Sequence, residues 1–212
     1  MSAPIPARIR MTSAQRRAQL IEVGLALFAE KGIEGTSVEE IAASAGVSKP
    51  LIYEHFGGKE GLYAVVVDRE MRALLQLISE SLLQGSPRVK AENAALAFLT
   101  YIETRSDGFR ILVLNSPVGG QSGSFATLLS EAASQVEHIF VSELTTRGFD
   151  PQMAPMYAQM LVGMVALTGQ WWLDARLLTR EEVAAHIVNL AWNGLVGLES
   201  KPKLSRNSAG NK

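Results

Sequence analysis

Two short amphipathic segments, joined by the four residues Ala45-Gly46-Val47-Ser48, constrain the fold of this chain more than any other feature. The first segment spans 38–45, and its apolar residues repeat at the spacing of one helix face: Val38, Ile41, Ala42 and Ala45. Gly46 can adopt the left-handed conformation that ends such a helix. Ser48 can cap the next helix, with Pro50 in its first turn. A tight glycine turn between two helices predicts a helix-turn-helix.

The start of the first of these helices has two candidate capping boxes. Thr36 with Glu39 and Ser37 with Glu40 both fit the pattern. A further helix is predicted upstream over 16–31, ending at Gly32, and Gly57-Gly58 ends the third helix. The first sixty residues therefore predict three packed helices.

The remainder of the chain is also predicted to be helical. Helices are expected over about 59–84, 88–105, 124–147, 153–177 and 181–198, and a loop or short helices over 107–123. No alternating strand pattern or hairpin signal is present. The predicted fold class is all-α.

Composition limits the possible functions. Apolar residues make up 47% of the 212 residues, so a large core is expected, and a net charge of −1 gives no overall basic field. Nucleic-acid binding would therefore depend on local charge. The absence of cysteine fits a reducing compartment, and residues 1–11 carry no secretory signal, so a cytoplasmic protein is expected.

A stretch without charged residues raises the question of a membrane span. It runs from Pro151 to Leu173, which is close to the length of a transmembrane helix. Polar residues interrupt it, and Asp150 and Asp174 flank it where basic residues would be expected. We interpret it as a helix buried on two sides, and we expect no membrane partner.

Enzymatic function is the main alternative class, and the motifs disfavour it. The histidines are His55, His138 and His186, and no HExxH, phosphate-binding loop or nucleophile elbow is present. Glu137 and His138 are adjacent and so lie on different helix faces, which makes a poor metal pair. We expect no catalytic residue, metal or cofactor.

The run from Gly35 to Leu62, GTSVEEIAASAGVSKPLIYEHFGGKEGL, resembles the DNA-binding signature of the TetR family. The resemblance implies an N-terminal three-helix helix-turn-helix DNA-binding domain, followed by a helical ligand-binding and dimerisation bundle. It also implies a homodimeric repressor that a small hydrophobic or aromatic effector releases from palindromic, double-stranded operator DNA.

The resemblance assigns DNA contacts to Thr36, Ser48, Lys49, Pro50, Leu51, Tyr53, His55 and Lys59. The hydroxyl or backbone N–H of Thr36 and Ser48 would meet phosphates at helix starts. Tyr53 and His55 would touch the DNA backbone, and Lys59 would meet a phosphate at the start of the next helix.

Base edges would be read at the start of the same helix. Lys49 would approach guanine and Pro50 a thymine methyl group. Glu54 either accepts a hydrogen bond from cytosine or points away, and Phe56 is expected to be core. Basic residues near the N-terminus could form an arm in the minor groove or a solvated tail.

The second half of the chain carries two sets of apolar residues. The helix expected over 153–177 has no charged residue before Asp174 and is apolar on two sides, so it needs a packing partner on each side. One set would line a ligand pocket: Phe98, Tyr101, Ile102, Phe125, Leu129, Phe140, Met160, Met164 and Trp171. The other set would form the dimer interface: Leu161, Val165, Trp172, Ile187, Leu190 and Gly194.

The predicted domains are a flexible basic arm (1–13), a DNA-binding domain (14–60), a ligand-binding and dimerisation domain (61–200) and a disordered tail (201–212). Two other functions stay open within the same fold. One is a DNA-binding regulator that responds to no ligand, and the other is a protein–protein adaptor that keeps the helix-turn-helix only as a scaffold.

Overall fold

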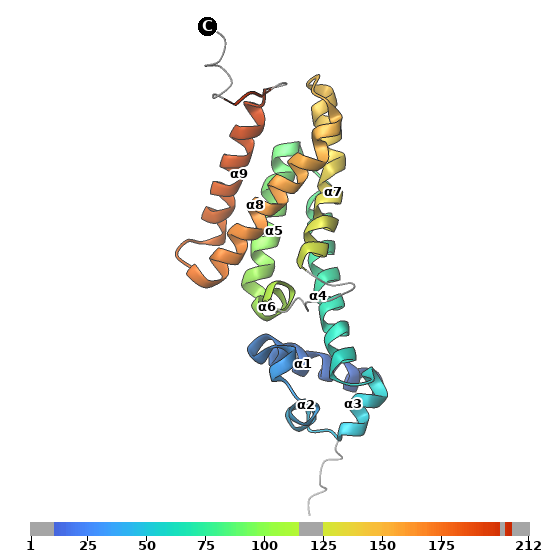
Figure 1. Cartoon of the computed structure of the whole chain (residues 1–212). Helices are drawn as coiled ribbons and strands as arrows, with labels where there is room; N and C mark the ends of the chain where they lie inside the picture. Colours follow the sequence, from blue (N-terminus) through green and yellow to red (C-terminus); the bar gives the residue numbers. More distant parts are fainter. Residues whose placement is uncertain (1–10, 115–124, 200–201, 205–212) are drawn as a thin grey trace, which may run out of the picture.

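The computed structural model describes residues 11–114, 125–199 and 202–204, and within these ranges it contains helices and no strand (Figure 1). The all-α prediction is confirmed. The helices are α1 (Ser13–Gly35), α2 (Val38–Ala45), α3 (Lys49–Phe56), α4 (Lys59–Ser81), α5 (Pro87–Thr104), α6 (Ser106–Leu114), α7 (Phe125–Thr146), α8 (Ala154–Ala175) and α9 (Arg180–Val196), with a short 3-10 turn over Pro151–Met153 before α8.

Helices α1–α3 and the start of α4 form the head, at the lower end of the molecule in Figure 1. Ser37 is the residue that caps α2, since its hydroxyl accepts a hydrogen bond from the Glu40 N–H at 3.1 Å. Gly46, with φ of 64°, ends α2 in the left-handed conformation. The sequence thus predicted the turn between α2 and α3 correctly.

The head and the body, which comprises the rest of α4 with α5–α9, share a continuous apolar core. In the head, Leu20, Phe28, Ile41, Ile52 and Leu62 are fully buried. The core continues along α4 into the body, and α1 packs against both α4 and α6. Helix α4 therefore belongs to both parts and connects them (Figure 1).

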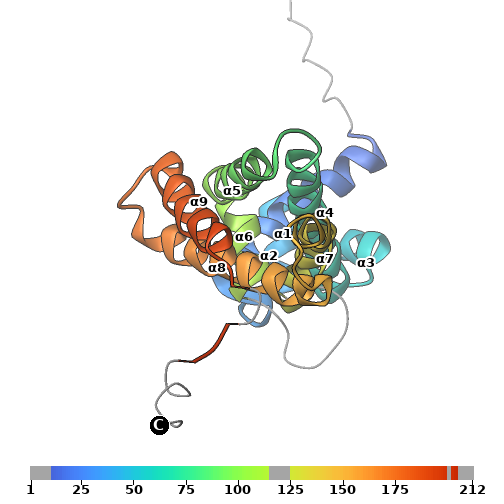
Figure 2. The same cartoon turned by 90° about the horizontal axis from the view of Figure 1, so that it is seen from above.

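Viewed from above, helices α5, α9, α8, α7 and α4 follow one another around the body (Figure 2). Helix α7 packs along α8, and α5 packs along α9. The segment 107–123, predicted as a loop or short helices, contains α6, and its part from 115 lies outside the described residues. Within the described ranges, no helix combines the length and the hydropathy needed to span a membrane.

Helix α8 approaches α5 most closely at Gly169. A Cβ atom there would lie 2.3 Å from the Phe98 ring and 2.6 Å from Cδ1 of Ile102. Because both side chains are buried, we predict that Gly169→Ala lowers the free energy of unfolding by about 1–3 kcal/mol in urea denaturation. Gly163→Ala is the control on the same helix, since its Cβ would meet nothing within 4 Å. That variant should gain up to about 1 kcal/mol from helix propensity. Equal shifts in the two variants would contradict the close approach.

Candidate nucleic-acid interface and ligand pocket

Helix α3 is anchored by one face and presents the other to solvent. Ile52 is fully buried in the head, whereas Ser48, Lys49 and Pro50 are exposed and Tyr53 is 55% exposed. Ser48 precedes the helix, and its side chain makes no capping hydrogen bond. The start of α3 therefore offers a hydroxyl and helix N–H groups, which are donors suited to an anion such as phosphate. Leu51 and His55 are half-buried, and Glu54 is exposed.

An ion pair lies at the edge of this exposed surface. The Lys49 ammonium donates a hydrogen bond to the carboxylate of Glu39 on α2, and both side chains are exposed. The hydrogen bond from Lys49 lowers the pKa of the Glu39 carboxyl below its ordinary value. Glu39 thus competes with any anion that Lys49 would otherwise bind.

We predict that Glu39→Gln strengthens binding to DNA of unrelated sequence. Freeing Lys49 lets it bind a phosphate, so the slope of log affinity against log salt concentration should steepen by about 0.9 for each additional phosphate that is neutralised. Fluorescence anisotropy with a random duplex at several salt concentrations measures this slope. Glu40→Gln is the matched control, because Glu40 pairs with Lys31 of α1 and not with α3. Identical slopes for the two variants would show that Glu39 does not restrain Lys49.

Two residues predicted to contact phosphate make hydrogen bonds inside the head, and their contacts to DNA stay a prediction. Thr36 is buried, and its hydroxyl donates to the backbone oxygens of Gly32 (2.8 Å) and Leu27 (3.3 Å). The Lys59 ammonium donates to the oxygens of Ile33 (3.0 Å) and Thr36 (3.2 Å). Both side chains therefore donate to backbone carbonyl oxygens in or just after the last turns of α1.

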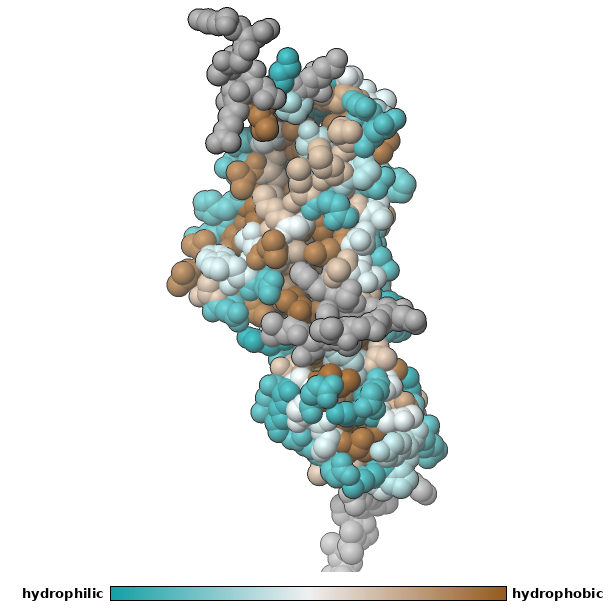
Figure 3. Space-filling model, in the orientation of Figure 1, coloured by the Kyte–Doolittle hydropathy of each residue, from teal (hydrophilic) through white to brown (hydrophobic). Residues whose placement is uncertain are grey.

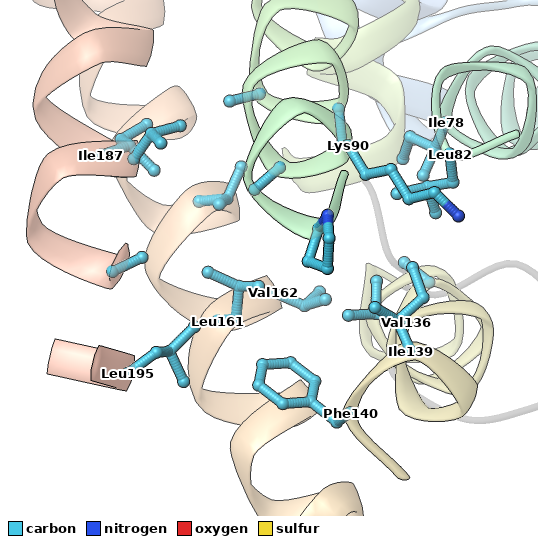
Figure 4. A pocket seen from close by; sticks show the side chains of 18 of the residues that line it. Ile78, Leu82, Lys90, Val136, Ile139, Phe140, Leu161, Val162, Ile187 and Leu195 are labelled. Carbon is cyan, nitrogen blue, oxygen red and sulfur yellow. The ribbon is translucent and has the colours of Figure 1, made fainter. Parts of the chain in front are cut away.

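The body encloses an elongated apolar pocket of about 150 Å³ between α4, α5, α7, α8 and α9 (Figure 4). Its apolar lining includes Leu74, Ile78, Leu82, Ala94, Ala95, Phe98, Leu128, Leu129, Ala132, Val136, Ile139, Phe140, Leu161, Val162, Val165, Ala166, Ile187, Val188, Ala191 and Leu195. Such a lining favours an apolar ligand over a polar one.

Three charged residues also line the pocket: Lys90, Glu143 and Arg147. Arg147 pairs with Glu143 at 3.6 Å and donates to the Leu195 carbonyl oxygen at 3.1 Å. Lys90 extends from α5 beside Ile78 of α4 and Leu82, the residue that follows α4 (Figure 4). Among the described residues, Lys90 is the charged lining residue to which no ion pair is assigned.

The outer faces of α8 and α9 expose large apolar side chains. On α8 these are Met156, Met160, Leu167 and Trp171, and on α9 they are Leu190 and Val196. Figure 3 shows hydrophobic side chains over the front of the body, while the head is mostly hydrophilic. An apolar surface of this kind is typical of a protein–protein interface.

Comparison with known families accounts for both parts of the chain. The family model described as bacterial regulatory proteins, tetR family, matches residues 20–66. The model described as tetracyclin repressor-like, C-terminal domain, matches residues 78–206, which is more than half of the chain. The chain belongs to the TetR family of transcriptional regulators.

Individual relatives agree with this assignment. The transcriptional activator FasR of Mycolicibacterium smegmatis is 29% identical over 189 residues, covering 88% of this chain and 85% of that protein. The repressor KstR2 of Rhodococcus jostii is 36% identical over 72 residues, covering about a third of each chain. A TetR-like regulator from Rhodococcus sp. RHA1 has the same fold, with a TM-score of 0.76, 24% identity, and coverage of 89% of this chain and all of that one.

As a member of the TetR family, the chain is a DNA-binding transcriptional regulator. TetR regulators act as dimers, and the relatives found are regulators and not enzymes. The exposed face of α3 lies in the part of the chain that matches the N-terminal TetR model, and the lining of the apolar pocket, apart from Leu74, lies in the part that matches the C-terminal model.

The structure places several of the predicted pocket residues elsewhere. Phe98, Leu129 and Phe140 line the pocket, but Met160 and Trp171 are exposed on the outer face of α8. Tyr101 instead bonds to a buried carboxylate, and Ile102 packs against Gly169. Met164 packs against the core outside the pocket, and the side chain of Phe125 lies outside the described residues.

The predicted dimer residues also divide into two groups. Leu190 and Gly194 are exposed on α9, as an interface requires, but Leu161, Val165 and Ile187 line the pocket. Trp172 is buried and donates from Nε1 to the Leu178 carbonyl oxygen at 2.8 Å. The two stripes of α8 were therefore assigned the wrong way round, because periodicity reveals two apolar faces without saying which one points inward.

Residue size was the signal that could have oriented α8. The inward face contains Ala154, Ala158, Ala166 and Gly169, which allow neighbouring helices to approach closely, whereas the methionines Met153, Met156 and Met160 lie outward. Sequence reasoning also missed Lys90, since a lysine in an amphipathic helix is usually solvated.

Proposed function

We propose that this TetR protein is a cytoplasmic homodimeric repressor that binds a palindromic operator through α3 and leaves it when a small hydrophobic ligand fills the body pocket. The observation that carries the proposal is the free face of α3, with Ser48, Lys49, Pro50 and Tyr53 exposed at the end of the molecule away from the pocket. A helix presented in this way fits the major groove.

The outer apolar face of α8 and α9 supports the dimeric part of the proposal. A second copy of the chain would cover these side chains by two-fold symmetry. The two α3 helices must then lie about 34–36 Å apart to enter successive major grooves. A ligand that favours a different separation weakens operator binding, typically by 5–150-fold for a coupling of about 1–3 kcal/mol.

Selection from genomic DNA tests the DNA-binding part. Purified protein is incubated with fragmented genomic DNA, and fragments retained at about 150 mM salt are sequenced, since weak electrostatic binding is lost there. An enriched inverted repeat is expected. Recovery of unrelated fragments, or of none, would contradict the proposal.

A reporter gene placed behind the recovered repeat determines the sign of regulation. FasR is described as an activator, and the KstR2 relatives are described as repressors. Expression should fall when the protein is supplied. A rise would replace the proposed repressor by an activator and leave operator binding intact.

Binding of an apolar dye tests the pocket. The environment-sensitive dye 1-anilinonaphthalene-8-sulfonate should bind the wild type saturably, and Ala132→Phe, which fills part of the lining, should abolish most of that signal. Ala185→Phe is the control, because Ala185 is exposed on α9 outside this pocket. An equal signal from all three proteins would place the dye outside the pocket and contradict a ligand site there.

A further inference from the structure

A buried carboxylate lies where the head meets the body, and neither the DNA-facing surface nor the pocket uses it. Glu70, in the middle of α4, has no exposed surface. Its oxygens accept hydrogen bonds from the Tyr101 hydroxyl at 2.9 Å and from Arg105 at 2.8 and 3.0 Å. The Arg69 Nε donates to it at 3.1 Å. Burial raises the pKa of the Glu70 carboxyl, but the hydrogen bonds from Arg105 and Tyr101 and the charges of both arginines outweigh burial and lower it overall.

Three helices meet at this carboxylate. Glu70 and Arg69 belong to α4, and their partners Tyr101 and Arg105 lie at the end of α5. The backbone of α6 passes directly over the cluster, because a Cβ at Gly108 would lie 2.3 Å from Oε2 of Glu70. Helix α6 in turn packs against α1 of the head.

Arg69 extends the cluster into the head itself. While its Nε bonds to Glu70, its terminal nitrogens donate to the Glu22 carboxylate of α1 at 2.5 and 3.5 Å. The remaining contacts between α1 and the body are mostly apolar, and apolar contact is non-directional. The Arg69 guanidinium makes directional hydrogen bonds to the carboxylates of Glu22 and Glu70. It therefore fixes the angle between head and body, which apolar packing alone leaves adjustable.

The same helices carry the nearest wall of the pocket. Leu74 follows Glu70 by four residues on α4, and Phe98 precedes Tyr101 by three on α5, so each pair lies on one helix face. The Phe98 ring also packs edge-on against Phe109 of α6, with 5.5 Å between ring centres. The groups that hold the carboxylate are therefore one helical turn from the pocket lining.

We infer that Glu70 is a positioning residue: through Arg69 and Glu22 it fixes the angle of the head on the body, and thereby the half-site spacing that the dimer accepts. This inference rests on the proposed function, since it concerns how two heads meet one operator. Neither Glu70 nor Arg69 needs to touch DNA for this role.

Operators of altered spacing test the inference. The repeat selected by the wild-type protein is synthesised with its native spacing and with one base pair added or removed, which moves a half-site by about 3.4 Å and turns it by about 34°. A duplex with a single half-site reports on the head alone. The proteins compared are the wild type, Arg69→Gln, Glu22→Gln and, as control, Arg72→Gln.

Arg72 is a matched control because it lies on the same helix and pairs with Asp68, one turn away. Glu22→Gln is a mild change, since this side chain is largely exposed and its shape is retained. The wild type and Arg72→Gln should prefer the native spacing by about tenfold, the usual order of cost of one unfavourable base pair. Arg69→Gln and Glu22→Gln should lower that preference at least about threefold, while their affinity for the single half-site stays unchanged.

A spacing preference equal to that of the wild type in both Arg69→Gln and Glu22→Gln would overturn this inference alone. So would a proportional loss of affinity for every duplex, which is what a merely structural role predicts. If the wild-type protein selects no inverted repeat, the proposed function fails first and this inference fails with it.

Discussion

Leu190→Glu is expected to separate the dimer and to lower operator affinity by about 10²–10⁴-fold, which is the advantage that two linked binding sites have over one. Leu190 is 67% exposed on α9, so the substitution leaves the core of the single chain intact. In a dimer formed through α8 and α9, two carboxylates would be buried without partners, and that is costly. Analytical ultracentrifugation measures the oligomeric state, and anisotropy measures operator affinity.

Leu83→Glu is the control for this prediction. Leu83 is 73% exposed, which makes it as accessible as Leu190, but it lies in the turn between α4 and α5. This variant should stay dimeric and keep its operator affinity. A dimeric Leu190→Glu protein with normal affinity would exclude this face of α9 from the interface.

Lys49→Ala is expected to weaken operator binding by about 30-fold to 10⁴-fold. A lysine contact to a guanine edge is worth about 1–3 kcal/mol, and a dimer makes it twice. The substitution also leaves Glu39 facing the DNA without its partner. The double variant Lys49→Ala/Glu39→Ala separates these two effects. It should regain the part of the operator affinity that is lost because the unpaired Glu39 carboxylate faces the DNA. Fluorescence anisotropy with the selected operator measures both affinities.

Lys31→Ala gives the comparison for Lys49→Ala. Lys31 also pairs with a glutamate of α2, Glu40, but it belongs to α1 and not to α3. Equal losses for the two lysine variants would mean that affinity responds to the charge of the head and not to a contact from α3.

The sequence predicted the head well because its signals are local. Gly46 and Ser48 specify the turn and the next helix start, and the structure has both where they were expected. Local signals also fixed most helix boundaries, such as the start of α9, expected at 181 and found at Arg180 behind a capping box of Thr179 and Glu182.

Contacts between residues far apart in the chain could not be predicted from the sequence. Lys59 binds the carbonyl oxygen of Ile33, 26 positions earlier, and nothing in the local pattern predicts this contact. Glu70 is a similar case, since its partners lie more than 30 positions away on α5. Charged residues in amphipathic helices are usually solvated, so a buried one is visible only once the helices are assembled.

Helices α8 and α9 each separate the pocket from the outer apolar face by a wall that is one helix thick. Leu161 and Val165 face the cavity, while Met160 and Leu167 on the same turns face outward. Filling the cavity would therefore press on the back of the surface through which we propose that the subunits join. Coupling between two binding equilibria is reciprocal. If a ligand changes the affinity of the subunits for each other, then dimer formation must change the affinity of the protein for that ligand. Dilution of the protein should then shift its ligand titration curve, which makes the concentration of the regulator part of its sensitivity.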